Sequence, residues 1–390
     1  MSDIDCELAE LRRRLLTWLM TDALPLWWRV GADHEGGGFH EAVDVSGHPV
    51  LADRRARVQA RQIFAYAAGG SLGWAGPWRE AVAHGLDYFI DHYRRADGLF
   101  WNAVTAAGEP IETPPHLYEQ AFALLALATA TGAESGRRAL EPIAVAIVER
   151  LYADRRGAAG GFTGFVDEAV YQSDPHMHLL EAALAWDEVA PDPRWRRLAD
   201  EVVALCLARF IAPECGALLE YFDASWRPAA GEAGRLVWPG HQFEWAGLLE
   251  RWGRARGRDD VRGVARRLYA IGADHGIDPV RGVAVFELLD DFSVHDPKAR
   301  LWSQTEWLKA AMIMARAQPP GEQRDAYLAD AVVAARALTL YLDTPVRGLW
   351  RDRLLGDGTW VDEPAPASSF YHIIDALRVL AGGWATELGA

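Results

Sequence analysis

Cysteine and long hydrophobic segments are scarce in this chain. Its 390 residues include three cysteines, namely Cys6, Cys206 and Cys215. These are too few and too scattered for a disulfide framework or a zinc cluster. No segment approaches the eighteen or so consecutive apolar residues that a membrane-spanning helix requires. The first thirty residues carry three consecutive arginines from Arg12 inside an amphipathic pattern, which is not that of a secretory signal. We therefore expect a cytoplasmic protein with no membrane partner.

Positive charge is also in deficit. The formal net charge is -15 at pH 7, with 55 acidic residues against 40 lysines and arginines. Nucleic acids and anionic membrane surfaces bind basic patches, so neither is an expected partner. The chain contains no P-loop and no dinucleotide-binding fingerprint, since "GGGF" from Gly36 lacks the required strand and helix on either side. We expect no cofactor.

Apolar and aromatic residues are plentiful. Half of the chain is apolar, and it contains 17 tryptophans. A chain of this length buries a sizeable core, either as one large domain or as two to three ordinary ones. Indole faces also stack on sugars, although core packing accounts for most individual tryptophans. Because no linker or low-complexity run divides the sequence, we expect one domain over residues 1–390.

One pattern recurs along the chain: a glycine, a short aromatic or β-branched run, and turn residues. Its six occurrences are "GGGFHEAVDVSG" from Gly36, "DGLFWNAVTAAGEP" from Asp97, "GGFTGFVDEAV" from Gly160, "GALLEYFDASWRP" from Gly216, "RGVAVFELLDD" from Arg281 and "RGLWRDRLLGDG" from Arg347. They are spaced by roughly 55 to 66 residues, which indicates a repeat architecture. Each occurrence predicts a short β-hairpin in a connecting loop.

Two helical patterns lie between successive β segments. The early helix of each pair is apolar all round, as in "YEQAFALLALATA", whereas the late helix carries charge on one face, as in "RRLADEVVALCLARF". The opening helix, Leu8 to Trp27, pairs with a last helix from Ser368. The pattern therefore predicts an all-α fold, an (α/α)6 barrel of about twelve helices, with the early helices inside. An open α-solenoid is the alternative, which six units and a pairing of first and last helices disfavour.

Polar residues gather near the start of the six early helices. In such a barrel, side chains in the first turns of the inner helices would face a funnel. The segments are "QAR" ending at Arg61, "PPHLYEQAF" with Tyr118, "DPHMHLLEA" with Asp174, His178 and Glu181, "PGHQFEWAG" with His241 and Glu244, "RLWSQTEWL" with Trp302 and Glu306, and "SSFYHII" with His372. Random placement would scatter these residues, so their recurrence predicts a site in the funnel. His176, two positions before His178, points elsewhere on a helix and is expected to be structural.

The residue types suit proton transfer on a polyol. His241 and Glu244 are three apart and Trp302 and Glu306 four apart, so each pair shares a helix face. Histidines transfer protons in both directions near neutral pH, and a neighbouring glutamate sets the tautomer of the ring. Three histidines, namely His178, His241 and His372, could also bind a metal ion. Without an HExxH motif or a Cys–His cluster, we expect no metal and favour sugar isomerisation or epimerisation.

Six motifs in this order resemble the N-acylglucosamine 2-epimerase superfamily over nearly the whole chain. They are "QAR" at Gln59, "YEQAFAL" at Tyr118, "PHMHLLEA" at Pro175, "GHQFEWA" at Gly240, "WSQTE" at Trp302 and "SSFYHI" at Ser368. The family fold is an (α/α)6 barrel, in agreement with the repeat count. Its members include mannose isomerases, sulfoquinovose isomerases and cellobiose 2-epimerases.

The resemblance implies a role for each site residue. His241 and His372 would be the acid/base pair, with His241 assisting ring opening and His372 moving the carbon-bound proton through a cis-enediol. Glu244 would orient His241, and His178 would position the open chain. Binding of the sugar would fall to Arg61, Tyr118, Asp174, Trp302 and Glu306.

Two departures from the family pattern bear on the substrate. Asp174 stands where family members usually carry asparagine, and "PAPASSFYH" lacks the tryptophan that disaccharide epimerases place before the final histidine. The resemblance therefore favours a free monosaccharide, with D-mannose to D-fructose as the expected reaction and D-lyxose to D-xylulose as a side activity. The protein would be a monomer or a homodimer.

Three alternatives stay open at this point. A 2-epimerase of a free or N-acylated sugar, or a sulfoquinovose isomerase, would use the same histidines. A glycoside hydrolase on the same barrel would need two carboxylates, for which the candidates are Asp167, Glu220, Glu244, Glu287 and Glu306. A non-catalytic sugar-binding protein would tolerate the loss of His241 and His372.

Overall fold

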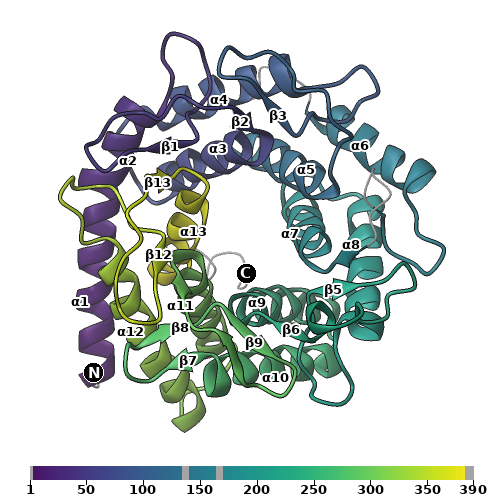
Figure 1. Cartoon of the computed structure of the whole chain (residues 1–390), viewed down its shortest axis with the longest axis vertical. Helices are drawn as coiled ribbons and strands as arrows, with labels where there is room; N and C mark the ends of the chain where they lie inside the picture. Colours follow the sequence, from purple (N-terminus) through teal and green to yellow (C-terminus); the bar gives the residue numbers. More distant parts are fainter. Residues whose placement is uncertain (1–2, 134–139, 164–169, 383–390) are drawn as a thin grey trace.

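Two concentric rings of helices make up most of the computed structural model, which describes residues 3–133, 140–163 and 170–382 (Figure 1). The inner ring consists of α3 (Ala56–Ser71), α5 (Leu117–Gly132), α7 (Asp174–Val189), α9 (Pro239–Arg256), α11 (Leu301–Arg316) and α13 (Ser369–Ala381). The outer ring consists of α4 (Trp78–Tyr93), α6 (Glu141–Asp154), α8 (Pro193–Leu205), α10 (Asp259–His275), α12 (Glu322–Tyr341) and α1 (Asp3–Trp18). The predicted inner and outer assignments are confirmed.

The inner ring is closed. Each inner helix contacts the next one along the chain, and α13 packs against α3, the first of the ring. In the outer ring, α1 packs against α12, so the first and last outer helices lie side by side. The described helices therefore form an (α/α)6 barrel, and the alternative of an open solenoid is wrong.

Hydrophobic side chains fill the space between the two rings. In α5 nearly every residue is buried, which explains why its sequence is apolar all round. In α8 the buried residues fall on one stripe and the charged ones face outward. A representative contact is the stacking of Trp186 on α7 against Trp195 on α8, with ring centroids 5.0 Å apart. Tryptophan thus serves the core here, as expected for most of these residues.

Short antiparallel strands pair between successive repeats. Strand β2 (Arg54–Arg55) leads into α3 and pairs with β3 (Ala103–Val104) of the next repeat. The same arrangement joins β4 (Tyr171–Gln172) to β5 (Tyr221–Phe222), β6 (Leu236–Val237) to β9 (Glu287–Leu289), β11 (Ala299–Arg300) to β12 (Arg353–Leu354) and β13 (Ala365–Pro366) to β1 (Ala42–Val43). The last pair links the sixth repeat to the first and so closes the ring.

The predicted short β-hairpins are present in the connecting loops, most of them as single bridges. Among the described residues, named strands pair locally only in β7 (Ile277–Asp278) with β8 (Val283–Ala284), and in β9 with β10 (Val294–Asp296). Elsewhere the hairpins shrink to single bridges, such as Val104 with Pro110, because the same strand residues also pair with the neighbouring repeat. The third predicted β segment falls largely on residues 164–169, outside the described residues, as does Asp167.

A buried side chain near the start of five inner helices clamps the loop that precedes it. In four repeats this clamp is a glutamine whose carboxamide accepts from a backbone N–H and donates to the carbonyl of the same loop residue. The pairs are Gln59 with Phe39, Gln120 with Phe100, Gln242 with Leu218 and Gln304 with Ala284. In the third repeat His176 takes this place, since its Nε2 accepts from the N–H of Phe162 at 3.0 Å. The clamps fix the height at which the following residues enter the barrel.

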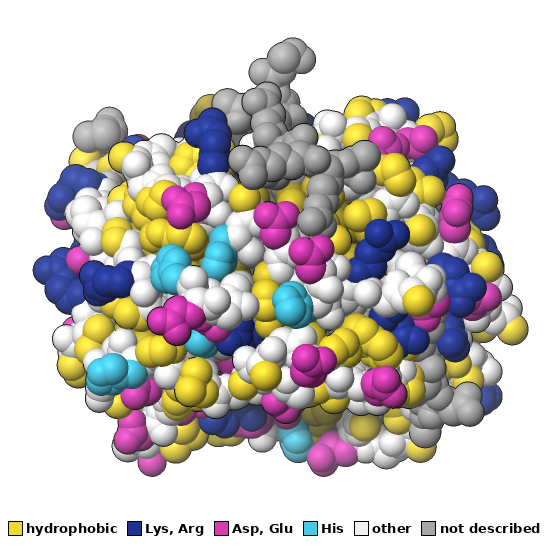
Figure 2. All heavy atoms as spheres, turned by 90° about the horizontal axis from the view of Figure 1, so that it is seen from above, with side chains coloured by type: hydrophobic (Ala, Val, Ile, Leu, Met, Phe, Trp, Pro, Cys, Tyr) yellow, Lys and Arg dark blue, Asp and Glu magenta, His cyan; other side chains and the backbone are white. Residues whose placement is uncertain are grey.

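Charges of both signs are interspersed over the face of the molecule drawn in Figure 2, where hydrophobic side chains lie between them. That face has no continuous basic surface, in agreement with the acidic net charge of the chain. Among the described residues, no helix combines the length and the apolar character needed to cross a membrane.

Candidate active site

Two layers of side chains line the interior of the barrel. We call the first layer the lumen ring. Five of its residues each follow a clamp residue by two positions, and the sixth is His372 on α13. Its members are Arg61, Phe122, His178, Glu244, Glu306 and His372. One helical turn deeper lies a second layer, the lower layer, whose members are Phe64, Leu125, Glu181, Gly247, Lys309 and Asp375. The clamps thus explain why chemically active residues recur at one height.

A cavity of about 220 Å³ lies on the lumen ring at the end where the inner helices begin. We call it the front cavity. Its lining contains every residue to which the family resemblance gives a role except Glu306, which lies behind His372. These residues are Arg61, Tyr118, Asp174, His178, His241, Glu244, Trp302 and His372. His176 does not line this cavity, as the sequence predicts.

His372 is held in one orientation from α11. Its Nδ1 lies 2.9 Å from Oε1 of Glu306, a buried carboxyl on the neighbouring inner helix. Burial lowers the pKa of His372 well below its ordinary value, and the positive charges of Arg61 and Lys309 act in the same direction. The ring is therefore neutral near pH 7, and its Nε2 is available to accept a proton.

His241, unlike His372, is protonated near neutral pH. Its Nδ1 lies 2.8 Å from Oε2 of Glu220, which also accepts from the hydroxyl of Ser173 at 3.2 Å. Burial alone would lower the pKa of His241, but Glu220 together with Asp174 raises it to about 9. His241 is therefore an imidazolium near neutral pH and can donate a proton. The expectation that Glu244 orients His241 is wrong, because Glu220 makes that hydrogen bond.

His178 lies between two carboxylates. Its Nδ1 lies 3.1 Å from Oε2 of Glu181, and its Nε2 lies 3.3 Å from Oδ1 of Asp174. Burial opposes the charged form, but these neighbours raise the pKa of His178 well above its ordinary value. Asp174 in turn lies 3.9 Å from Nε2 of His241. His178 is therefore a positive charge beside the cavity, fixed by the hydrogen bond of its Nδ1 to Glu181.

Glu244 and Glu306 differ in protonation. Burial and the nearby charge of Glu306 raise the pKa of Glu244 to about 8, and it has no cation closer than His178, 4.0 Å away. Burial also raises the pKa of Glu306, but the ammonium group of Lys309, 2.7 Å away, opposes the rise. The pKa of Glu306 is raised to about 7, below the value of about 8 for Glu244, so Glu244 holds the proton more firmly and Glu306 is the first of the two to ionise as the pH rises.

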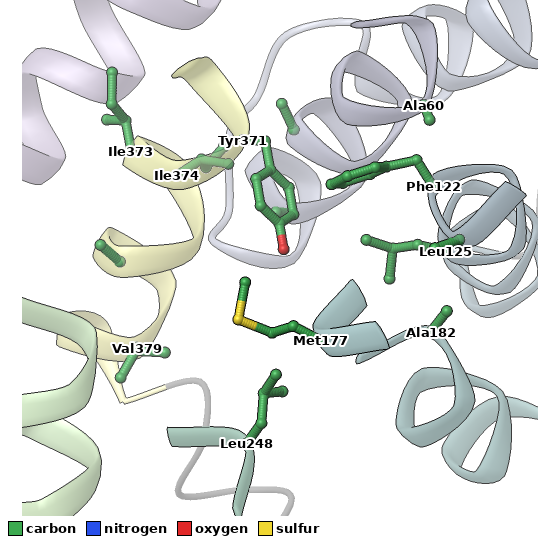
Figure 3. Close-up of a cluster of buried hydrophobic side chains, with 14 of the residues drawn as sticks. Ala60, Phe122, Leu125, Met177, Ala182, Leu248, Tyr371, Ile373, Ile374 and Val379 are labelled. Carbon is green, nitrogen blue, oxygen red and sulfur yellow. The ribbon is translucent and has the colours of Figure 1, made fainter. Parts of the chain in front are cut away.

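Arg61 lines the front cavity and packs against aromatic rings. The guanidinium of Arg61 donates to the hydroxyl of Tyr118 at 2.8 Å and lies over the ring of Phe122. Phe122 and Tyr371 lie edge to face (Figure 3), with ring centroids 5.9 Å apart. Trp302 also lines the front cavity and packs beside His241, with 5.1 Å between the ring centroids.

Several lining residues escaped the sequence reasoning. Trp238, Phe286, Arg55, Arg57 and Arg300 all line the front cavity. The three arginines already have carboxylate partners, which are Glu41, Glu119 and Asp352. One signal was available, because Arg55 and Arg300 are the residues directly before two inner helices. Phe286 carried no such signal, since the β9 loop reaches the cavity only through tertiary packing.

Two groups of His and carboxylate atoms in the described residues are compact enough for a metal ion. One comprises His178, Glu181 and Glu244, and the other Glu244, Glu306 and His372. In the second group Lys309 already supplies a positive charge to Glu306. In the first, Tyr371 donates to Glu181 and His178 is itself cationic. These neighbours make both groups poor donor sets for a further cation.

The sequence profile described as N-acylglucosamine 2-epimerase (GlcNAc 2-epimerase) matches residues 37–376. The chain belongs to this family.

Individual members of the N-acylglucosamine 2-epimerase family extend the likeness over nearly the whole chain. A mannose-6-phosphate isomerase of Rhizobium meliloti (strain 1021) is 48% identical over 372 residues, covering 94% of this chain and 95% of the relative. A D-mannose isomerase of Thermobifida fusca is 26% identical over 353 residues, covering 78% and 84% of the two chains. The crystal structure of a D-mannose isomerase superposes with a TM-score of 0.85 at 19% identity, over 96% of this chain and 97% of that chain.

Membership of the N-acylglucosamine 2-epimerase family sets the class of activity. The chain is a sugar isomerase or epimerase, with relatives named as mannose isomerases. Within the family's barrel, the front cavity brings the neutral His372 together with the protonated His241. This pair is what a proton transfer between adjacent carbons and their oxygens requires.

Proposed function

We propose that this chain interconverts D-mannose and D-fructose in the front cavity, through a cis-enediol and without a cofactor. The observation that carries the proposal is the difference in protonation between two histidines that line the front cavity, since His372 is neutral and His241 is protonated. A base and an acid with separated pKa values are the pair that isomerisation uses at neutral pH. The names of the Thermobifida fusca and Rhizobium meliloti relatives support the mannose configuration.

His241 and His372 divide the proton transfers between oxygen and carbon. His241 donates a proton to the ring oxygen as the pyranose opens and takes the proton of the C1 hydroxyl, so it is again an imidazolium. It then protonates the carbonyl oxygen at C1 as Nε2 of His372 removes the proton from C2, which yields the enediol. The imidazolium of His372 returns that proton to C1 while the neutral His241 accepts the proton of the C2 hydroxyl, so that the ketose forms and both histidines regain their starting protonation. Arg61 stabilises the developing negative charge on oxygen.

The remaining lining residues position the sugar. Trp302 offers an apolar face to the sugar ring, and Tyr118 and Asp174 offer hydrogen bonds to hydroxyl groups. The small cavity suits a monosaccharide, and D-lyxose, which lacks only C6 of mannose, fits the same requirements as a side substrate. His178 holds Asp174 in place through its ion pair.

The test is proton NMR of unlabelled D-mannose with the enzyme in D2O, run beside the His372→Ala variant. Fructose should appear with the parent and fail to appear with the variant. Glucose appearing first, with deuterium at C2, would instead make the chain a 2-epimerase. Unchanged mannose would reject this substrate, and N-acylglucosamine, sulfoquinovose and cellobiose would then be tried in its place.

D-mannose 6-phosphate is the second candidate substrate. The Rhizobium meliloti relative bears that name, and Arg55, Arg57 and Arg300 line the front cavity. These arginines already form ion pairs with Glu41, Glu119 and Asp352. Because their charges are neutralised, we favour the unphosphorylated sugar as the substrate. Comparison of kcat/KM for the two sugars, in the parent and in Arg55→Gln, separates them. A phosphate site at Arg55 predicts that the variant loses activity on the phosphorylated sugar alone.

A further inference from the structure

Lysine is nearly absent from this chain, yet one lysine lies inside the barrel. Lys298 and Lys309 are the only lysines among 40 lysine and arginine residues. Lys298 is on a loop, whereas the side chain of Lys309 is 8% exposed, in the lower layer on α11. The proposed isomerisation uses no group of that layer directly. A buried cation in a chain that otherwise uses arginine calls for a physical reason.

Lys309 joins two inner helices through two carboxylates. Its Nζ lies 2.7 Å from Oε2 of Glu306 on its own helix and 3.0 Å from Oδ2 of Asp375 on α13. Glu306 uses its other oxygen, Oε1, for His372. A continuous path of polar contacts therefore runs from Lys309 through Glu306 to Nδ1 of His372.

A compact ammonium group can contact both carboxylates from one point, because lysine presents a point charge on a flexible stem. The charged and titratable groups that face Lys309 are Glu181 from α7, Glu244 from α9, Glu306 from α11, and Asp375 from α13, whose other oxygen binds Arg378. A single positive charge at this centre counters several carboxyl groups at once.

The charge on Glu306 decides which nitrogen of His372 carries the proton. An ionised Glu306 can only accept, so Nδ1 of His372 must be N–H and Nε2 keeps its lone pair. A protonated Glu306 can donate to Nδ1, and the proton of the neutral ring then moves to Nε2. In that tautomer His372 cannot remove a proton from carbon. Burial and nearby carboxylates push Glu306 toward the protonated form, and Lys309 is the cation in contact with it.

We propose that Lys309 is a positioning residue that keeps Glu306 ionised and thereby fixes His372 as the Nδ1–H tautomer. Lys309 touches neither the front cavity nor the sugar, since it lines a separate cavity of about 370 Å³ at the other end of the barrel. The use of Nε2 as a base rests on the proposed function, but the tautomer itself does not.

The test reads the tautomer directly in the resting protein. Long-range proton–nitrogen NMR of histidine-labelled enzyme distinguishes a protonated from an unprotonated ring nitrogen, and His372→Asn identifies the resonances of His372. Between pH 7.5 and 8.5, above the pKa of about 7 of Glu306, the parent should show Nδ1 protonated and Nε2 unprotonated. Lys309→Met should move the proton to Nε2 or make the ring titrate within this range. Lys309→Arg, which keeps the positive charge, should show the parent pattern.

Kinetics on the same variants give a second readout. Loss of the Lys309 charge raises the pKa of both Glu306 and His372, since Lys309 lowers each of them. The acidic limb of kcat/KM should therefore move to higher pH in Lys309→Met. At pH 7, kcat should fall by about tenfold or more while KM changes by less than about threefold.

Two further variants keep the proposal falsifiable if Lys309→Met does not fold. Lys309→Gln retains an N–H donor without charge and should show the same loss of the Nδ1–H tautomer. Asp375→Asn leaves the Lys309–Glu306 pair intact, so His372 should keep the Nδ1–H tautomer. An unchanged tautomer in folded Lys309→Met or Lys309→Gln would overturn the proposal, as would a switch in Asp375→Asn. Because no sugar is present, a parent that fails to convert mannose would reject the proposed function while leaving this result to stand.

Discussion

Nδ1 of His241 and Oε2 of Glu220 lie 2.8 Å apart, although 21 residues separate them in the chain. Glu220 comes from the loop before β5, and His241 from the first turn of α9. Both groups are buried, so their attraction is weakly screened by solvent. This contact, rather than one within α9, sets the charge of the acid in the front cavity.

Glu220→Gln should move the basic limb of the pH profile toward neutrality. Protonated His241 serves as the acid, so activity is present below its pKa of about 9 and lost as the pH rises through it. Without Glu220 that pKa falls, by about one to three units for a lost charge partner at this distance. The measurement is kcat/KM between pH 6 and 10. A basic limb that stays in place would contradict the role of Glu220.

Glu250→Gln is the matched control for this substitution. Glu250 is also buried and lies on α9, but its carboxylate pairs with Arg262, 2.9 Å away, and lines no part of the front cavity. Removing its charge should lower the stability of the protein. It should leave the position of the basic limb unchanged, because no histidine of the site contacts it.

The contrast between Glu220 and Glu244 shows how far the sequence leads. The repeat and the helical spacing sufficed to predict the barrel, its inner helices and the residues that enter the funnel, because these follow from periods of 3.6 residues and of about 60 residues. The hydrogen-bond partner of each histidine could not be predicted from these periods. Glu244 shares a helix face with His241, yet it points deeper into the barrel, while a loop residue supplies the hydrogen bond.

Trp302→Leu should weaken sugar binding more than turnover. Trp302 lines the front cavity, and loss of an aromatic face costs about 1 kcal/mol, which corresponds to a rise in KM of about fivefold. Trp307 on the same helix is a core residue packed near Phe243. Trp307→Leu should therefore lower the melting temperature and leave KM unchanged. Steady-state kinetics and thermal unfolding of both variants test this, and equal KM values for the two would contradict it.

Chelation should leave the activity unchanged. Lys309 and protonated His178 already neutralise the carboxylates that a metal ion would otherwise bind. Dialysis against EDTA followed by assay in metal-free buffer should retain kcat/KM within about twofold. Loss of activity that Mn²⁺, Co²⁺ or Mg²⁺ restores would contradict this and would point to the compact group of Glu244, Glu306 and His372.

The two histidines of "DPHMHLLEA" have separate tasks despite their proximity. His178 lines the front cavity, whereas His176 is the clamp of its repeat and accepts from the N–H of Phe162. The sequence predicted this division from helix geometry. It could not predict the clamp itself, because the loop residue that Gln59 or Gln120 holds is identified only by tertiary contact.

His176→Gln should make the stability of the protein less sensitive to acid. Burial lowers the pKa of His176 to about 4, below the value near 6.5 of the unfolded chain. The unfolded state therefore binds the extra proton first, and stability falls as the pH drops from 7 toward 4. At pH 5 the loss from this one group is about 2 kcal/mol. Glutamine fills the clamp in four other repeats and carries no such charge, so the variant should avoid this loss. Urea unfolding of both proteins at pH 7 and pH 5 measures the difference, and an equal loss in the two would show that His176 is not the buried neutral clamp.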